Sequence, residues 1–315
     1  MILVSYNTRD RLARCLRSLV DQPRSLSLEI VVVDNASTDG SADLVARRFP
    51  RVTLVRNDRN VGYAAANNQA LAISRGRRLL LLNPDTVVPH GVPSALLRDI
   101  EECGEGVGIV GCRLLRLDGT LDLACRRSFP TPLTALWRFL RLARVFPRSR
   151  SFGRYNLTYL DPRGTYEVDS VVGAFMLVKR EVYERIGGLD ESFFMYGEDL
   201  DWCFRARSSG FVVRYVGSVT VVHEKGASSR LAALRMNYHF HRAMVLFHRK
   251  HLGPRYAGVL NALVYAGIAA RFLALTPVAA GVAACRAMGL RRARRRPPRE
   301  ARCAGGVASP ASTTL

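Results

Sequence analysis

LLLLNPDTVV, at residues 79–88, is the stretch from which the architecture can be worked out. Its four leucines suffice for a buried strand and are too few for a membrane span. Pro84 cannot donate to a sheet ladder, so the strand ends there and Asp85 stands at its carboxyl end. In open α/β sheets ligands bind at that end, and a carboxylate there suits a divalent cation that carries a diphosphate. Taken alone, however, the stretch favours a simpler interpretation, in which Asp85 only caps a turn.

Strands and helices alternate along the first 110 residues. β-Branched and leucine-rich runs predict strands, and apolar residues at helical spacing predict the helices between them. The expected strands are 2–4, 29–33, 52–55, 79–82 and 107–110, and the expected helices are 12–20, 42–49, 63–74 and 91–103. This alternation predicts a parallel sheet with helices on both faces. Asn7, Asp34, Asn60 and Asp85 each follow a strand, which predicts one shared ligand-binding edge.

The pattern is weaker between residues 111 and 170. Within it, residues 133–146 set Leu136 and Trp137 against several arginines. That composition allows either an ordinary helix on the core or an interfacial helix that acts as an acceptor lid, and both interpretations stay open. Residues 168–178 predict a strand with Gly173 inside it. Glycine within a strand often marks the close approach of a ligand or of another backbone.

Acidic and aromatic residues mark the segment that follows. The expected elements are a helix at 179–186, an aromatic loop at 193–196, a helix from 198 to 209, and strands at 212–216 and 219–222. Glu198 and Asp199 open the second helix, and His223 comes directly after the last strand. These three side chains are therefore placed at the ends of elements, where ligands are commonly bound.

The C-terminal part changes character. Residues 231–251 predict a basic helix with four histidines, which we interpret as a solvated or membrane-facing surface. Residues 257–285 are almost entirely apolar, but Arg271 and Pro277 interrupt them. Each half is shorter than the roughly 20 residues that a spanning helix needs, so a re-entrant or interfacial pair of helices is expected. The arginine-rich stretch that follows would bind anionic lipid on the cytoplasmic side, and the end of the chain is expected to be disordered.

The net charge of +21 comes from 47 Lys and Arg against 26 Asp and Glu over 315 residues. Such a balance indicates an anionic partner, either nucleic acid or an acidic membrane surface. No zinc-finger, homeodomain or RNP-like motif is present, so we expect the membrane and no nucleic acid. The seven cysteines are odd in number and form no CxxC pair, which predicts free thiols in a reducing cytosol. The N-terminus does not resemble a signal peptide, and a start upstream of Met1 stays open.

Seven stretches, in this order, resemble the family 2 inverting glycosyltransferases of the GT-A fold. They are similar above all to the rhamnosyltransferase-like enzymes of bacterial cell-wall and surface-polysaccharide assembly. The stretches are VSYNTRDRLARCLRSL (4–19), VVVDNASTDGS (31–41), NVGYAAANNQA (60–70), LLLLNPDT (79–86), VVGAFMLVKRE (171–181), IGGLDESFFMYGEDLDWCFRARSSGF (186–211) and VVHEKGASS (221–229). The order is specific for the superfamily and much less so for the sugar.

The resemblance implies an α/β GT-A fold with a mostly parallel central sheet, helices on both faces, and C-terminal helices associated with a membrane. We expect residues 1–110 to form the nucleotide-sugar-binding half and 111–230 the acceptor-binding and catalytic half of one domain. Residues 231–290 would form the membrane-associated helices, and 291–315 a basic disordered tail.

The resemblance also implies a nucleotide site. Asp34 would accept hydrogen bonds from the base or ribose, although capping of its own loop is the alternative. Ser5, Tyr6 and Asn7 would line the base. The remaining residues expected around the nucleotide sugar are Asn60 and Gly62 in a tight turn, Asn67 on the same side by helical spacing, Asn83, Asp85 and Gly173.

For the metal, the resemblance points to Mg²⁺ or Mn²⁺ on Asp85, bridging the two phosphates. The family's usual Asp-x-Asp appears here as Asn83-Pro84-Asp85, so one carboxylate ligand remains and tight binding of the ion without substrate is in doubt. His223 is the candidate second ligand, and a histidine would favour Mn²⁺. The alternative is that His223 is merely hydrogen-bonded.

Asp199 is the expected general base, by resemblance, because it lies at a helix start where the dipole favours the anion. The alternative is that Glu198 and Asp199 only stabilise the first turn of their helix. Glu198 is expected to orient the acceptor, and Asp201 and Arg205 to form a structural i,i+4 pair. No nucleophile stands out for a double displacement, so direct attack with inversion is expected.

The predicted function is therefore inverting transfer of a sugar from a nucleotide diphosphate donor to a glycan or a lipid-linked saccharide. dTDP-rhamnose is the first expectation for the donor and a UDP-hexose the second. The acceptor would belong to the cell wall or a surface polysaccharide and could be linked to polyprenyl diphosphate. The protein is expected on the cytoplasmic face of the membrane, held through residues 257–302. The alternatives are a polyprenyl-phosphate glycosyltransferase and a non-catalytic scaffold of a polysaccharide assembly complex.

Overall fold

The computed structural model describes residues 1–294 except 24, 103, 105 and 225–232, with side chains as far as residue 281. Its strands are β1 (Ile2–Ser5), β2 (Val31–Asp34), β3 (Thr53–Arg56), β4 (Arg78–Leu82), β5 (Thr86–Val87), β6 (Val107–Leu115), β7 (Thr165–Val168), β8 (Phe175–Lys179) and β9 (Val212–His223). Its α-helices are α1 (Arg9–Val20), α2 (Ser41–Arg48), α3 (Tyr63–Ile73), α4 (Val92–Glu102), α5 (Pro132–Phe139), α6 (Leu142–Val145), α7 (Arg180–Ile186), α8 (Glu198–Ser208), α9 (Ala233–Phe247) and α10 (Gly258–Arg294).

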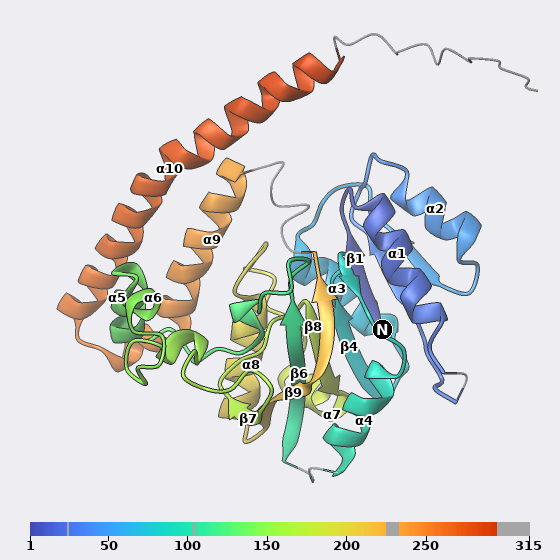
Figure 1. Cartoon of the computed structure of the whole chain (residues 1–315), viewed down its shortest axis with the longest axis horizontal. Coiled ribbons are helices and arrows are strands. Elements are labelled where there is room, and N and C mark those ends of the chain that lie inside the picture. The colour runs from blue at the N-terminus through green and yellow to red at the C-terminus, as the bar shows by residue number, and fades with distance from the viewer. Residues whose placement is uncertain (24, 103, 105, 225–232, 295–315) are drawn as a thin grey trace, which may run out of the picture.

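Within these residues all strands join one sheet, in the order β3-β2-β1-β4-β8-β6-β9-β5, with β7 beside β9 (Figure 1). Strands β1 to β4 are parallel to their neighbours in that group, whereas β8 runs antiparallel to both β4 and β6. The first part of the chain thus forms the predicted parallel sheet with its intervening helices. The antiparallel strand β8 connects it to the second part.

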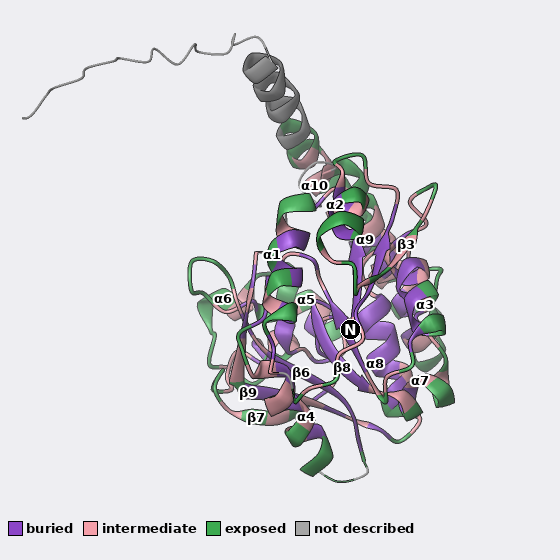
Figure 2. Cartoon of the chain, turned by 90° about the vertical axis from the view of Figure 1, so that its right-hand side faces the viewer, coloured by how far each residue is buried: buried purple, intermediate pink, exposed green. Residues whose placement is uncertain are grey.

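The core lies along the middle of the sheet. Strands β2 and β4 are buried along almost their whole length, as expected for parallel strands covered on both faces. Helix α1 buries Leu12, Leu16 and Leu19 against this layer. Figure 2 shows the buried strands at the centre and the exposed faces of the helices around them. The fold class predicted from the sequence is confirmed.

The segment 168–178 is not the single strand that its composition predicts. Strand β7 ends at Val168 and β8 begins at Phe175. The prediction fails because β7 pairs with β9 whereas β8 pairs with β4 and β6, so the chain has to cross from one ladder to another. Gly173 therefore lies in the crossing segment and not inside a strand. The two last predicted strands, in contrast, are one continuous strand, β9.

The predicted pair of C-terminal helices is also wrong, because α10 is one helix that continues through Pro277. Its segment Gly258–Gly281 is long and apolar enough to cross a membrane, by length and composition only. Arg271 does not interrupt the helix, since its guanidinium turns toward α9 and lies 3.1 Å from His241 Nε2. Figure 1 shows α10 beside α9, on the side of the molecule away from α1 and α2. The predicted basic tail beyond residue 294 lies outside the described residues.

For three of the four histidines of residues 231–251 the predicted solvated surface is wrong, and the membrane-facing alternative stays a prediction. His241, His248 and His251 are largely buried, and each meets a polar partner. His248 Nε2 lies 2.8 Å from Asn261 Oδ1, and His251 Nε2 lies 2.7 Å from Asp201 Oδ1. The first contact ties the turn after α9 to α10, and the second ties it to α8.

Four of the seven cysteines lie among the residues whose side chains the structure describes. Cys15, Cys112, Cys125 and Cys203 are buried free thiols. The prediction of free thiols is confirmed for these four.

Candidate active site

Strand pairing brings Asp85 and His223 together at one end of the sheet. Thr86 of β5 lies opposite His223, the last residue of β9, and Glu224 N donates to the Asp85 carbonyl at 2.8 Å. His223 Nε2 then lies 3.2 Å from Asp85 Oδ1. On the other side of the ring, His223 Nδ1 lies 3.3 Å from Asp122 Oδ2, a carboxylate that is 1% exposed. The imidazole is therefore clamped between two carboxylates.

The two carboxylates beside His223 determine the direction in which its pKa shifts. Burial lowers the pKa of His223, but the hydrogen bonds with Asp122 and Asp85 outweigh it and raise that pKa to about 9.

The same residues fit a divalent cation. A carboxylate that holds one ring nitrogen of a histidine leaves the other nitrogen as a ligand, and Asp122 holds Nδ1 so that Nε2 faces Asp85. Among the residues described, no three His, Cys, Asp or Glu side chains gather into a site that could hold an ion by itself. Asp85 and His223 would thus supply two ligands, and the remaining positions suit the oxygens of a diphosphate.

Next to this pair, Tyr63 connects two predicted site residues. Its hydroxyl lies 3.2 Å from Asn83 Oδ1 and 3.2 Å from the Gly173 carbonyl. Burial raises the pKa of Tyr63, and the nearby Glu198 and Asp199 raise it further, so the phenol stays protonated. Tyr63 therefore acts as a neutral donor that holds the end of β4 against the crossing segment before β8.

Asp199 is fixed by hydrogen bonds to both of its carboxylate oxygens. Oδ2 accepts from Arg127 Nη2 at 2.8 Å and from Gly173 N at 3.1 Å, while Oδ1 accepts from Leu200 N at 2.7 Å. The Arg127 and Asp199 side chains are only 12% and 8% exposed. The ion pair thus holds Asp199 as an anion at the start of α8, where the helix dipole also favours negative charge.

Glu198 differs from its neighbour. Its side chain is buried, and Oε2 has no hydrogen-bond partner within the described residues. Burial raises the pKa of Glu198 to about 8, with a further contribution from the charge on Asp199. Glu198 therefore holds its proton to higher pH than an exposed glutamate does.

The predicted pair Asp201 and Arg205 is confirmed, with Arg205 Nε 2.7 Å from Asp201 Oδ2.

The predicted nucleotide end is organised by amide side chains. Asn35 donates to Asn60 Oδ1 at 2.9 Å, and Asn60 Oδ1 also accepts from Gly62 N at 3.0 Å. Asp34 is buried, and its Oδ2 accepts from Ser37 N at 3.0 Å. Its Oδ1 is buried without a partner in the described part of the chain. Buried acceptors without a partner are rare in folded proteins, and the role of Asp34 in nucleotide binding stays a prediction.

Gly62 occupies a position that other residues would not tolerate. Its φ of +95° lies in the left-handed region, and a Cβ there would lie 2.8 Å from the Phe194 carbonyl oxygen and Cδ2. Tyr63 N donates to the same carbonyl at 2.7 Å. The turn predicted at Asn60 and Gly62 therefore rests directly on the aromatic loop that precedes α8.

A cavity of about 1000 Å³ runs past these groups. The predicted site residues that line it are Tyr6, Asn60, Asn83, Asp85, Gly173, Glu198, Asp199 and His223. The predicted residues outside its wall are Ser5, Asn7, Asp34, Gly62 and Asn67. Asn67 turns back onto its own helix and donates to the Tyr63 carbonyl, and Asn7 Oδ1 accepts from Thr38 N. Asn7 therefore joins the loop after β1 to the loop after β2, whereas Asn67 stabilises the first turn of α3.

Sequence reasoning missed Asp122, Arg127 and Tyr63. The first two lie in the stretch between β6 and β7, where neither periodicity nor motif spacing singled them out. An aspartate within LDGTLDL and an arginine within CRRSF have no local pattern that separates them from surface residues. Tyr63 lies inside one of the motif stretches, so the motif itself was the available signal.

Comparison with known proteins agrees with this geometry. Residues 1–187 match the family described as "Glycosyl transferase family 2". The chain belongs to glycosyl transferase family 2. Among curated relatives of this family 2 chain, the N-acetylglucosaminyl-diphospho-decaprenol L-rhamnosyltransferase of Mycobacterium tuberculosis is 28% identical over 274 residues. That match covers 82% of this chain and 85% of the relative. The O-antigen biosynthesis protein RfbC of Myxococcus xanthus is 30% identical over 74% of this chain, although the match spans only 18% of RfbC.

Solved structures share the fold. The mannosyltransferase PcManGT from Pyrobaculum calidifontis, in complex with GDP-Man and Mn²⁺, superposes with a TM-score of 0.54 at 21% identity, over 94% of this chain and 75% of that one. TarS of S. aureus, residues 1–349, gives a TM-score of 0.53 at 15% identity, over 88% of this chain and 72% of that one. At these identities the likeness establishes the GT-A architecture of this family 2 glycosyltransferase. The name of RfbC places that relative in O-antigen biosynthesis.

Proposed function

We propose that this protein transfers a sugar, with inversion, from a nucleotide diphosphate donor onto an acceptor hydroxyl of a cell-wall or surface-polysaccharide precursor. The observation that carries the proposal is that one cavity is lined both by candidate metal ligands and by a candidate general base. Asp85 and His223 can hold a cation with a diphosphate, and Asp199 is held as an anion that can accept a proton.

The proposed chemistry is one displacement. The acceptor oxygen attacks the anomeric carbon, the bond from that carbon to the diphosphate breaks with its electron pair, and the hydroxyl proton passes to Asp199. Protonated Glu198 adds no second charge beside Asp199 and can donate to the acceptor. When bound by Asp85 and His223, Mg²⁺ or Mn²⁺ would neutralise charge on the departing diphosphate. Arg127 and Gly173 N orient the Asp199 carboxylate throughout.

For the donor, we propose dTDP-rhamnose first and a UDP-hexose second. The L-rhamnosyltransferase of Mycobacterium tuberculosis supports the former through its similarity over most of both chains. The UDP-hexose is retained as the second proposal because the TarS structure determined with UDP-GlcNAc has a similar fold, with a TM-score of 0.51. Mn²⁺ in the PcManGT structure supports a metal-assisted reaction.

We also propose that the protein works at the cytoplasmic face of a membrane. The apolar segment Gly258–Gly281 supports contact with a membrane, because nearly all of its residues lie outside the core of the protein. Apolar side chains without a partner in the fold gain free energy when they enter the lipid boundary.

The test is the thermal stability of the purified protein with dTDP, UDP, GDP or ADP, each with Mn²⁺ or with EDTA. A ligand that binds only the native state raises the melting temperature by mass action. We expect one pyrimidine diphosphate to raise it, and the shift to vanish with EDTA and in Asp85→Ala. Asp43→Ala, at an exposed position in α2, is the matched control and should keep the shift.

A folded protein that responds to none of the four nucleotides would contradict the proposal. It would favour a non-catalytic scaffold that has kept the fold.

A further inference from the structure

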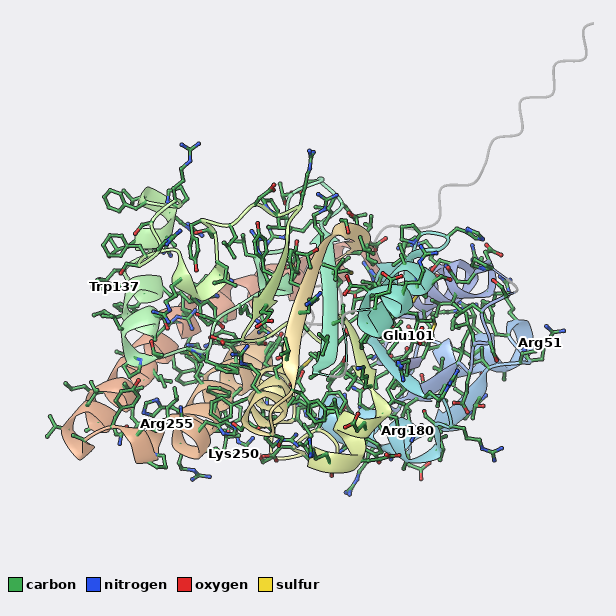
Figure 3. The ribbon with its side chains drawn as sticks, turned by 90° about the horizontal axis from the view of Figure 1, so that it is seen from below. Arg51, Glu101, Trp137, Arg180, Lys250 and Arg255 are labelled. Carbon is green, nitrogen blue, oxygen red and sulfur yellow. The ribbon has the colours of Figure 1, made fainter. Side chains whose placement is uncertain are left out.

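The cavity extends well beyond the groups assigned to the donor and to the base. Its far end is walled by α5, α9 and α10, which lie on the side of the molecule opposite α1 and α2 (Figure 1). The apolar residues of this wall include Leu136 and Phe139 of α5, Phe240 of α9, and Leu263 and Ile268 of α10. In the view from below, Trp137 of α5 lies next to the C-terminal helices and far from Arg51 (Figure 3). This end of the cavity is therefore apolar and adjoins the proposed membrane surface.

Two arginines, Arg138 of α5 and Arg271 of α10, line this apolar end. Arg138 donates to Asn156 Oδ1 at 3.0 Å and stacks 4.6 Å from the Tyr155 ring centre. Arg271 reaches His241 and lies 5.2 Å from the ring centre of Phe240. All of these partners are neutral groups or rings, and within the described residues neither arginine forms an ion pair.

The two guanidinium groups are like charges that line one cavity. Uncompensated positive charge next to an apolar wall favours an anion, because an anion between the two groups would relieve their repulsion. Guanidinium groups also match phosphate oxygens in geometry and bind them through paired N–H donors. The donor diphosphate is already assigned to the Asp85 end of the cavity, so this pair suits a second, separate anion.

The surface on both sides of the arginines is apolar. Leu133, Phe139 and Leu140 of the α5 segment are about half exposed, and Leu263 and Leu273 of α10 are about two-thirds exposed. A ligand whose charged group lies between the arginines thus has an apolar route out of the cavity along α5 and α10. Its other end would point along the cavity toward Asp199.

We propose that Arg138 and Arg271 bind the diphosphate of a polyprenyl-diphosphate-linked saccharide acceptor, with the prenyl chain between α5 and α10 and the saccharide directed at Asp199. This inference rests on the proposed function, since it names the acceptor of the same reaction. A phospholipid would meet the arginines with a single phosphate charge and would bring no saccharide hydroxyl to Asp199. The observations therefore favour the prenyl diphosphate.

The test uses the full chain in detergent micelles and measures binding of farnesyl diphosphate, farnesol and inorganic pyrophosphate. We expect farnesyl diphosphate to bind more tightly than either of the others, because only it has both the charge and the chain. Arg138→Gln and Arg271→Gln should each weaken it by about tenfold or more, as expected for a hydrogen bond between charged groups. The double variant should lose more than either single one.

The matched control is Arg144→Gln combined with Arg249→Gln, which removes two exposed positive charges from the same regions but outside the cavity. This control should keep farnesyl diphosphate binding. All variants should also keep the thermal shift with the donor nucleotide and Mn²⁺, because neither arginine belongs to the donor end.

Binding of farnesyl diphosphate that is equal in the wild type, the double variant and the control would overturn the assignment of the arginines. If pyrophosphate binds as tightly as farnesyl diphosphate and both need the two arginines, the proposed binding of a prenyl chain is overturned and the site binds anions only. A normal nucleotide shift alongside either result would show that only this inference fails. Loss of the nucleotide shift in the wild type would instead remove the proposed function itself.

Discussion

The guanidinium of Arg127 lies 2.8 Å from the carboxylate of Asp199, and the two residues are 72 positions apart in the chain. The contact joins the segment after β6 to the first turn of α8. Burial raises the free-energy cost of leaving either charge alone, because the protein interior solvates ions poorly. The pair therefore couples the stability of the fold to the orientation of the proposed base.

Arg127→Gln should lower the free energy of unfolding by about 3 kcal/mol, since it leaves Asp199 as an unpaired buried charge. Urea unfolding monitored by circular dichroism measures this change. Arg56→Gln breaks the exposed pair with Asp43 and should cost less than about 1 kcal/mol. Equal costs for the two variants would contradict the assignment of a buried ion pair.

Asp199→Asn should reduce the turnover number by about 100-fold to 10,000-fold, the range expected for loss of a general base. The amide keeps the side-chain shape, and its oxygen can still accept from Gly173 N, so the fold should persist. Initial rates of sugar transfer measure the turnover number, and binding of the donor nucleotide shows that the variant is folded. Unchanged turnover would assign the base elsewhere, and Glu198 would be the next candidate.

Asp122→Asn should raise the Mn²⁺ concentration that gives half of the full nucleotide-induced thermal shift by about 10-fold to 100-fold. The reason is that Asp122 sets the orientation of His223 through Nδ1. Asp118→Asn, in an exposed turn of the same segment, should leave the metal dependence as it is. The role of Asp122 is disproved if both variants need the same Mn²⁺ concentration as the wild type.

Glu198→Gln should stabilise the protein at alkaline pH. In the folded protein the pKa of Glu198 is raised to about 8, so between about pH 4.5 and pH 8 the folded state keeps a proton that the unfolded chain has released. Stability of the wild type therefore falls as pH rises through this window, by on the order of 5 kcal/mol for this one group. The amide cannot ionise and avoids that loss.

Thermal unfolding of the wild type and of Glu198→Gln at pH 5 and pH 8.5 measures the difference. Glu184→Gln, at an exposed position of α7, is the control and should follow the wild type at both pH values. A gap between wild type and Glu198→Gln that is the same at both pH values would contradict a raised pKa.

Gly62→Ala should destabilise the protein by about 2 kcal/mol or more, because it adds a methyl group against the Phe194 backbone to the cost of a positive φ. Gly91→Ala has a similar φ of +80° but open space around the new methyl group. The difference between the two variants in urea unfolding isolates the contact with Phe194. Equal destabilisation would show that this contact is unimportant.

Membrane binding can be tested without touching the cavity. Replacing Val259, Leu273 and Val278 of α10 by Gln should weaken binding to phosphatidylglycerol vesicles by at least about tenfold. The matched triple variant replaces three exposed apolar residues elsewhere, Val20, Ile73 and Leu117. Vesicle flotation that gives the same result for both triple variants would contradict a membrane role for α10.

The first half of the fold was predictable because local signals and tertiary structure agree there. Runs such as VVVD and LLLL become buried parallel strands, and the polar residue after each run marks the ligand edge. Asp85 and His223 were identified by the motifs around them. Their pairing through β5 and β9 then gives the contact that the motifs only implied.

The rest of the site depends on contacts between distant segments. Asp122 meets His223 across 101 positions, and Arg127 meets Asp199 across 72, with no periodic pattern at either end. The C-terminal prediction failed for a different reason. Arg271 was counted as a break in an apolar segment, whereas a long arginine side chain can turn aside to a neighbouring helix and leave its own helix intact.

The apolar helix α10 on the wall of the candidate cavity has a consequence for how the transfer rate depends on acceptor concentration. Under the proposed function, the enzyme and its lipid-linked acceptor both diffuse within the membrane. The rate of transfer therefore depends on the mole fraction of acceptor in the lipid and not on its bulk concentration. Diluting the bilayer with inert lipid should then slow transfer at constant total acceptor. The donor, which arrives from water, would keep ordinary saturation behaviour in the same assay.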